Sequence, residues 1–298
     1  MNTLSLPLYW QNEYFEQFHS RPIVVKNHGF LSHWFIDEKT LKSGFLAPFG
    51  GFWPITTDIS EMNIGLHIET VEKLGASLGS VEELQVRILP SELYANPEIA
   101  TFENLKSLGF VLNYTEIDHV VDLCSDWFSK WNRNRLRDLK NNDKILSIEE
   151  VVSDEYFQVI RNVIETNRSN KGLKSNIDVA SLKKWKSLFG SRTSYYLCTA
   201  KDKNLPVAAA ICQYVSDSMV YVYKWGDDRN ATKEIAIHSP ISNLAKFLFL
   251  EFQKRGVKKV YLGSSSKNGE IDLGLARFKE SIGSLRIEKK VVCKKFGF

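Results

Sequence analysis

The sequence contains little of what would place it outside the ordinary globular proteins. Its 298 residues include four cysteines, three methionines and eight prolines, and no Cys-x-x-Cys pair or zinc-like cysteine–histidine spacing occurs. These scarcities exclude a disulfide scaffold, a zinc finger and a collagen-like or low-complexity chain. We therefore expect reduced, mostly buried cysteines and no metal centre.

Long hydrophobic runs and targeting signals are also missing. The longest apolar stretch, residues 244–252, is interrupted by Lys246 and Glu251, and it is far shorter than the roughly 20 residues that a membrane span needs. Residues 1–5 show no basic segment leading into an apolar one, which is the pattern of a signal peptide. We expect a cytoplasmic protein without a transmembrane span.

The chain has no large excess of charge of either sign. Lysine and arginine number 39 against 35 acidic residues, which leaves a net charge of +4. This weak basic bias argues against a dedicated DNA-binding protein. The weak positive charge would still suit a small anionic substrate, or a weak encounter with RNA or an anionic lipid head group.

The chain alternates strand-like and helix-like segments, which predicts an α/β (α+β) fold. Polar breakers at residues 141–143 mark a boundary between domains of residues 1–143 and 144–298. For each domain we expect a mixed, mostly antiparallel sheet flanked by helices.

Hydrophobic periodicity places the individual elements. Strands are expected at residues 23–30, 31–36, 84–89, 110–116, 144–148, 194–200, 206–215, 219–224, 257–262 and 287–293. Helices are expected at residues 62–78, 99–108, 127–140, 154–168, 181–188, 239–255 and 273–280. Short turns between residues 194 and 224 predict an antiparallel meander, and residues 225–238 are expected to form a loop. Ser239 and Pro240 are a good N-cap and first residue for the helix that follows them.

Four stretches of the second half carry a resemblance to a known family. They are Tyr-Val-Tyr-Lys-Trp-Gly at 221–226, the helix from Ser239-Pro240 to Gly256, Val-Tyr-Leu-Gly-Ser-Ser at 260–265, and Gly-Leu-Ala-Arg-Phe-Lys at 274–279. In the first half, Ala-Pro-Phe-Gly-Gly-Phe at 47–52 and the basic segment 133–137 add to the likeness. Together with the order of the elements, they resemble the FemAB/FemX-like tandem members of the GNAT superfamily.

The resemblance implies two GNAT-like domains, of which the first shapes the substrate cleft and the second carries the chemistry. It implies N-acyl transfer to an amine of a sugar, an amino acid or a cell-envelope precursor, with an acyl-CoA as the expected donor. GNAT enzymes hold the CoA pyrophosphate in a glycine-rich loop at a helix N-terminus, and residues 228–239 contain no glycine. A FemX-like transferase that uses charged tRNA and a non-catalytic binding module therefore remain alternatives.

Four residues are candidates for catalysis. Lys279 is expected to stabilise the negative charge that develops on the acyl oxygen; otherwise it is a solvated lysine on a helix. Tyr221 and Tyr223 share one strand face. The GNAT resemblance implies that a tyrosine protonates the leaving thiolate, although strand tyrosines are more often packing residues. His238 is a candidate base, with a structural role as the alternative.

Binding candidates come from three loops and one basic helix. For the donor, the resemblance points to Ser239, Gly263, Ser264 and Ser265. Glycines beside aromatic residues indicate a tight, pocket-lining loop or a hydrophobic plug, and the residues concerned are Phe49, Gly50, Gly51 and Trp53. Arg135 could bind a phosphate, although arginine is usually solvated, and Trp225 completes the substrate set. These loops, the Tyr221 strand and Lys279 are predicted to line one cleft.

Overall fold

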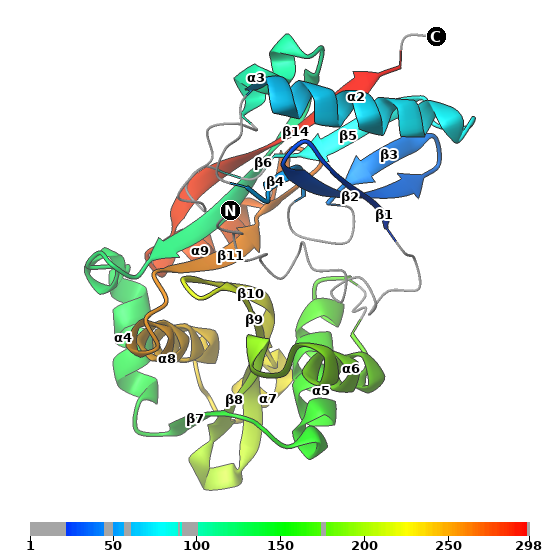
Figure 1. Ribbon diagram of the computed structural model, residues 1–298. Helices are drawn as coiled ribbons and strands as arrows, with labels where there is room; N and C mark the ends of the chain where they lie inside the picture. Colours follow the sequence, from blue (N-terminus) through cyan, green and yellow to red (C-terminus); the bar gives the residue numbers. More distant parts are fainter. Residues whose placement is uncertain are drawn as a thin grey trace. The chain divides into compact units, whose positions relative to one another are not determined.

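The computed structural model describes residues 22–44, 50–56, 61–88, 90, 101–173 and 177–296. The chain forms two compact units (Figure 1). Unit 1 consists of Met1–Asp118, Ser264–Asp272 and Ile287–Phe298, and unit 2 of His119–Gly263 and Leu273–Arg286. Each unit is thus built from segments that are distant in sequence. The boundary predicted at residue 143 lies inside unit 2, and the division of roles between two sequence halves stays a prediction.

Unit 1 contains a sheet with strand order β1-β2-β3-β5-β14-β6. Its elements are β1 (Ile23–Asn27), β2 (Phe30–Asp37), β3 (Thr40–Ser43), β4 (Trp53–Pro54), α2 (Glu61–Ser77), β5 (Glu83–Arg87), α3 (Phe102–Ser107), β6 (Val111–Asp122), β12 (Ser266–Lys267), β13 (Glu270–Ile271) and β14 (Leu285–Lys295). Strands β3 and β5 are parallel, whereas β2 is antiparallel to β1, β3 and β4. The last residues of β6 and the first of β14 belong to unit 2.

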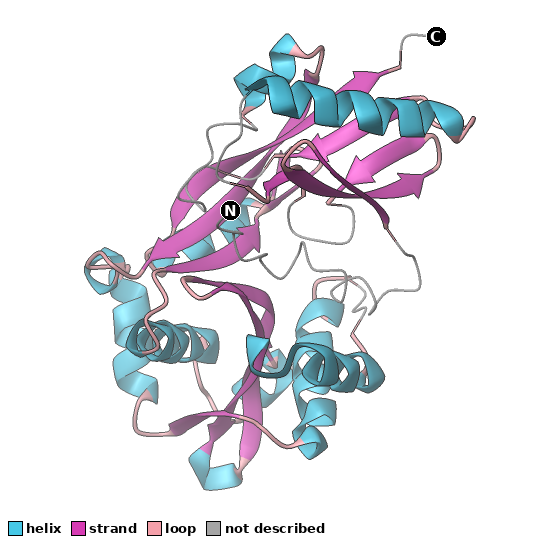
Figure 2. Ribbon diagram, viewed as in Figure 1, coloured by secondary structure: helices cyan, strands magenta, loops and turns pink. Residues whose placement is uncertain are grey.

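Helix α2 lies along one face of this sheet (Figure 2). Its apolar stripe packs against the sheet. Ile64, Ile68 and Val71 recur at helical spacing and are buried together with Trp34 of β2 and Leu41 of β3. This cluster is the core of unit 1. It confirms the helix predicted at residues 62–78.

Unit 2 contains a sheet with strand order β11-β10-β9-β8-β7. Its elements are α4 (Arg133–Asn142), β7 (Leu146–Glu150), α5 (Phe157–Ser169), α6 (Val179–Phe189), β8 (Thr193–Ala200), β9 (Leu205–Ser216), β10 (Met219–Asp227), α7 (Arg229–Glu234), α8 (Pro240–Lys254), β11 (Lys259–Ser264) and α9 (Leu273–Ser281). Strands β7 to β10 are antiparallel, so the predicted meander is confirmed, whereas β10 and β11 are parallel.

Helices α5 and α8 cover opposite faces of the unit 2 sheet. Neighbouring residues of a strand point to opposite faces. The ring of Tyr195 lies 4.6 Å from that of Phe157 on α5, and the ring of Tyr196 lies 6.0 Å from that of Phe252 on α8. The sheet is therefore buried on both sides, which explains why apolar residues follow one another along β8 and β9.

Two element predictions were wrong. The segment 127–140 is not one helix: a 3₁₀ turn covers Phe128–Lys130, Trp131 is extended, and α4 begins only after Asn132. The side chain of Asn132 accepts a hydrogen bond from the Asn134 amide, which starts the helix at this point. The residues after β10 are not all loop, because Asp228 caps the short helix α7.

No described helix is long and apolar enough to cross a membrane. Within the same residues, no group of three or more histidine, cysteine and acidic side chains is arranged to hold a metal ion.

Candidate active site

The parallel strands β10 and β11 separate part-way along their length. They pair only over Met219–Tyr221 and Lys259–Tyr261, after which both strands continue. We call Val222–Asp227 and Leu262–Gly263 the splay. Along the splay β10 stays paired with β9 but not with β11, so the backbone groups on this edge of β10 are not engaged by β11.

Tyrosine rings lie at the point where the splay begins. The Tyr221 ring centroid lies 5.0 Å from that of Tyr261 and 5.9 Å from that of Tyr223. Val222 is buried in the core, so the predicted alternation of this strand is confirmed. Gly263 has φ +73°, and a Cβ at this position would lie 3.2 Å from the Tyr221 hydroxyl oxygen. Glycine therefore provides both the turn and the room for the Tyr221 ring.

Lys279 reaches β11 from helix α9. Its side chain is buried, with 2% exposure, and its Nζ donates a hydrogen bond to the Gly263 carbonyl at 2.8 Å. The alternative of a solvated surface lysine is therefore wrong. The catalytic role expected for Lys279 stays a prediction, but the structure brings Lys279, Gly263 and Tyr221 together. Neighbouring Phe278 lies 5.7 Å, centroid to centroid, from Trp225 of β10.

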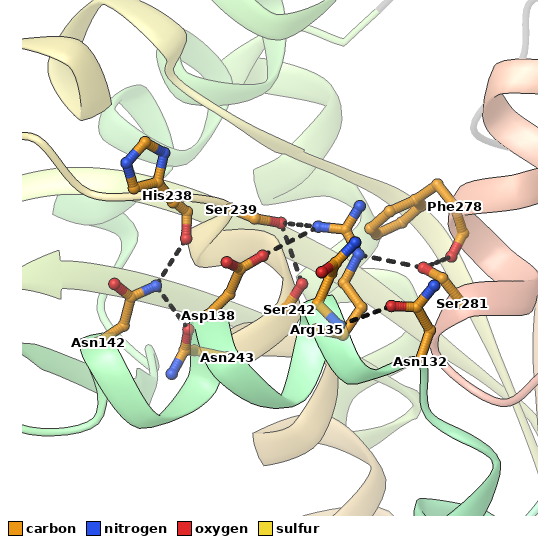
Figure 3. A network of polar contacts seen from close by, with 11 residues as sticks. Asn132, Arg135, Asp138, Asn142, His238, Ser239, Ser242, Asn243, Phe278 and Ser281 are labelled. Atoms are coloured by element: carbon orange, nitrogen blue, oxygen red, sulfur yellow. Dashed lines mark hydrogen bonds and ion pairs between the residues drawn. The ribbon is translucent and has the colours of Figure 1, made fainter.

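Arg135 of α4 connects two other helices (Figure 3). Its Nη1 donates to Ser239 Oγ at 2.6 Å and its Nε to Ser281 Oγ at 3.1 Å. The guanidinium also forms an ion pair with Asp138 at 3.4 Å and lies 5.4 Å from the Phe278 ring centroid. Arg135 thus fixes the start of α8 and the end of α9. Phosphate binding by this residue stays a prediction.

The residues before α8 are held in an unusual conformation. Ser239 is the N-cap, as predicted, but it adopts φ +50° and its side chain makes no capping bond. Its Oγ lies 3.0 Å from Ser242 Oγ. Asn142 Nδ2 donates to the His238 carbonyl at 2.7 Å and to Asn243 Oδ1 at 3.0 Å (Figure 3). The His238 imidazole is exposed, and its role as a base stays a prediction.

Lys224, within the splay, was not among the site residues predicted from the sequence. Lys224 is half-buried, and its Nζ lies 5.3 Å from the Tyr223 ring centroid. Burial, together with the positive charge of Arg168, lowers the pKa of Lys224 to about 8. Burial raises the pKa of Tyr223 to about 12, so this phenol is protonated at neutral pH. The only signal in the sequence was a lysine interrupting an aromatic strand.

The remaining predicted residues lie in unit 1. The Gly51 amide donates to Ser43 Oγ at 2.7 Å, and a Cβ on Gly50 would lie 2.2 Å from the Gly44 nitrogen. Close backbone packing therefore requires glycine at position 50, whereas at position 51 it is the backbone φ of +94° that favours glycine. Trp53 is half-buried in β4, opposite Leu31 of β2.

Two serines that follow Gly263 also belong to unit 1. Ser264 Oγ donates to the Ser266 carbonyl at 2.9 Å, whereas Ser265 is buried and its amide donates to the Ile117 carbonyl at 2.7 Å. Phe49 lies outside the described residues. The predicted cleft that joins these residues to Tyr221 and Lys279 stays a prediction.

The start of α8 has some, but not all, of the features that usually bind the pyrophosphate of coenzyme A. A helix N-terminus and the nearby Arg135 favour an anion. However, Arg229–Glu234 form helix α7 where a glycine-rich loop would be needed, and Ser242 N already donates to the Ser239 carbonyl at 2.9 Å. These residues do not fit the standard glycine-loop mode.

Comparison with solved structures identifies the fold. No family model matches the chain, and no curated protein matches it by sequence. FemX is 10% identical with a TM-score of 0.69, and the match covers 99% of this chain and 92% of FemX. The chain has a tandem GNAT fold of the FemX type. A tandem GNAT protein from the clavulanic acid biosynthesis pathway matches with 10% identity, a TM-score of 0.51, and coverage of 90% and 79%.

Another structural neighbour of this FemX-type fold is a putative lysylphosphatidylglycerol synthetase. Its C-terminal domain from Agrobacterium fabrum is 9% identical with a TM-score of 0.61, and the match covers 92% of this chain and 84% of that domain. The predicted fold class is therefore confirmed. At these identities the likeness concerns the fold alone.

Proposed function

We propose that the protein is an N-acyltransferase that moves an acyl or aminoacyl group to an amine. The observation that carries this proposal is the buried ammonium of Lys279, fixed on Gly263 beside Tyr221 where β10 and β11 separate. The FemX-type fold supports it, since the neighbours are named as FemX, a lysylphosphatidylglycerol synthetase and a tandem GNAT protein. By the same analogy, the acceptor is an amine of a sugar, an amino acid or a cell-envelope precursor.

The geometry supports a direct attack of the amine on the acyl carbonyl. The carbon–nitrogen bond forms through a tetrahedral centre, and the bond from the carbonyl carbon to the leaving group then breaks. Lys279 donates an N–H to the developing oxyanion, and its burial strengthens this interaction because little water competes. A protonated tyrosine, Tyr221 or Tyr223, gives its proton to the leaving group. The proton lost by the amine passes to His238 or to water.

The donor is either an acyl-CoA or a charged tRNA. Helix α7, in place of a glycine-rich loop, weighs against the usual mode of CoA binding and in favour of the tRNA alternative. A catalytically silent binding module is the third hypothesis. Calorimetry with acetyl-CoA, longer acyl-CoAs and charged tRNA distinguishes the three: CoA binding supports the first, tRNA binding the second, and binding of neither favours the third.

Lys279→Ala tests the catalytic proposal. We expect turnover to fall by roughly 100-fold, the usual loss when an oxyanion donor is removed. Arg277→Ala is a matched control, because Arg277 is an exposed cation on the same helix. It should leave turnover unchanged. Equal rates for the two variants, with both folded by circular dichroism, would contradict the proposed role of Lys279.

A further inference from the structure

A β-bulge in β10 brings Lys224 to the same side of the strand as Tyr223. The pairing with β9 shifts by one residue between Val222 and Lys224. In regular alternation, Lys224 would follow Val222 into the core between the sheet and α8. The bulge changes this alternation: Val222 and Trp225 pack in that core, and the Lys224 Nζ lies 5.3 Å from the Tyr223 ring centroid. The bulge thus keeps this lysine out of the core and places it in the splay with the tyrosines.

A series of contacts connects Lys224 with Lys279. The Lys279 ammonium is bonded to the Gly263 carbonyl, and Gly263 packs against the Tyr221 ring. That ring lies 5.9 Å from the ring of Tyr223, which carries Lys224 above it. A substrate that lies across this tyrosine pair therefore has an amino group at each end.

Lys224 differs from Lys279 in its surroundings. Lys279 donates to a carbonyl, whereas Lys224 makes no ion pair or hydrogen bond with any described residue. The close partner of Lys224 is the Tyr223 ring, against which Trp185 of α6 packs edge-on at 4.9 Å between centroids. A half-buried amine beside aromatic rings is poorly solvated, and poor solvation favours its neutral form. Lys224 can therefore accept a proton at near-neutral pH.

Charged groups on the elements around Lys224 do not hold it in the protonated form. Strand β9 contains no charged residue, and β11 does not pair with this part of β10. The positive charge of Arg168 on α5 acts together with burial to lower the pKa of Lys224 to about 8. Tyr223 stays protonated, because burial raises its pKa to about 12. The neighbouring carboxylates have other partners, and two lysines of α6 are exposed: Glu165 is paired with Arg161, Asp154 with Lys186, and Asp227 with Asn167, whereas Lys183 and Lys184 face solvent.

We propose that Lys224 is the general base that takes a proton from the ammonium group of the acceptor. The neutral Lys224 amine removes one proton, and the freed lone pair of the acceptor forms the carbon–nitrogen bond at the acyl carbonyl. A tyrosine protonates the leaving group as the bond to it breaks, and a second proton of the nitrogen restores that tyrosine. Lys224 then releases its proton to solvent. This inference rests on the proposed function, and it makes Lys224, instead of His238 or water, the acceptor of the proton.

The pH dependence of turnover in the full chain tests this role. Acetyl-CoA or charged tRNA is supplied as the donor, and free lysine, whose side-chain amine is an ammonium ion at pH 7, as the acceptor. We expect kcat to rise with pH through an apparent pKa of about 8 and then to level off. Lys224→Gln should lose this rise and roughly 100-fold of kcat at pH 7. With hydroxylamine as the acceptor, which is already neutral at pH 7, the loss should be no more than about threefold.

Lys224→Arg separates a base from a structural cation. Arginine keeps a positive charge over the Tyr223 ring but does not lose its proton in this pH range. It should therefore be as slow as Lys224→Gln, whereas Lys183→Gln, which removes an exposed lysine from α6, should match the wild type. Aminoethylation of Lys224→Cys with bromoethylamine restores an amine at this position and should recover most of the lost turnover, with wild type treated in the same way as the control. Wild-type turnover in Lys224→Arg, or an unchanged rise with pH in Lys224→Gln, would overturn the proposal.

Direct titration of Lys224 lets the two proposals fail separately. In NMR spectra of ¹³Cε-labelled lysine, the signal that is missing from Lys224→Arg belongs to Lys224, and it should titrate near pH 8 without any substrate. A titration near the ordinary value of about 10.4 would overturn the base role and leave the proposed function intact. No turnover by the wild type with either donor, beside a titration near pH 8, would overturn the proposed function and the base role with it.

Discussion

Units 1 and 2 both bury polar side chains, but in different combinations. In unit 1, Trp34 Nε1 donates to Ser32 Oγ at 2.7 Å, and the same Oγ lies 2.8 Å from His67 Nε2. The indole only donates, so Ser32 Oγ accepts from Trp34 and can donate its own proton to His67 Nε2. The His67 proton then resides on Nδ1, which lies 3.2 Å from the Asn27 carbonyl. This chain of bonds needs a neutral imidazole.

Unit 2 also buries a histidine beside a serine, His119 and Ser284, and in addition it buries thiols and phenols. Burial raises the pKa of Cys198 to about 12 and moves the pKa values of Cys212, Tyr195 and Tyr196 upward. These groups remain neutral at physiological pH and act as packing residues. Two lysines of unit 2, the half-buried Lys224 and the buried Lys279, lie at the splay. We therefore expect changes in unit 1 to act on stability and changes near the splay to act on ligand binding.

The largest effect is expected at the buried ion cluster of unit 1. Lys289 Nζ lies 2.9 Å from Glu116 Oε2 and 3.1 Å from Asp118 Oδ2, and all three side chains are buried. Lys289→Met would leave two carboxylates facing each other without a cation. We expect a loss of about 3–5 kcal/mol in the free energy of unfolding, measured by urea titration.

Two further variants sharpen this test. Lys295→Met removes an exposed lysine from the same strand and should cost little. Combining Lys289→Met with Glu116→Gln and Asp118→Asn removes all three charges, and it should recover part of the lost stability. If Lys289→Met were as stable as Lys295→Met, the cluster would contribute nothing to unit 1.

The second-largest effect is expected from acid, which should destabilise unit 1. Burial lowers the pKa values of His33 and His67 from 6.5 to about 4. The unfolded chain takes up these protons as the pH falls below about 6.5, whereas the folded chain resists until about pH 4. Stability is therefore complete above pH 6.5 and is lost between 6.5 and 4, by up to about 3 kcal/mol per histidine.

Hydrogen exchange at pH 7, 5.5 and 4.5 measures this loss in each unit separately. Peptides from β2 and α2 should lose protection before peptides from β8 and β9. His67→Gln keeps a polar group but does not titrate, so it should flatten the pH dependence of unit 1. Earlier loss of protection in β8 and β9 would reverse the comparison between the units.

The sequence predicted most elements because their patterns are local. The apolar stripe of α2 and the alternation around Val222 are set by neighbouring residues, and both were confirmed. The burial of Lys279 could not be predicted from such a local pattern. Its burial depends on the Gly263 carbonyl, 16 residues away in sequence.

Features that depend on distant contacts could not be predicted. Lys289 forms an ion pair with Glu116, although more than half of the sequence separates the two residues. No local sequence pattern could have predicted this pair. The bulge before Lys224 depends on the register with β9, which one strand does not reveal. Ser239 was expected to cap α8 through its own side chain, but Arg135, on another helix, binds its hydroxyl.

The smallest effect on stability is expected for Gly263→Ala, with a larger effect on the site. At φ +73° an alanine is strained by about 1–2 kcal/mol, and its Cβ would press on the Tyr221 ring at 3.2 Å. Gly256→Ala is a matched control, because it has φ +81° and its Cβ would meet nothing within 4 Å. Both variants should lose similar stability in thermal unfolding, and Gly263→Ala alone should lower turnover. Equal turnover in the two variants would mean that Tyr221 adapts freely, and the packing at the splay would then not govern the chemistry.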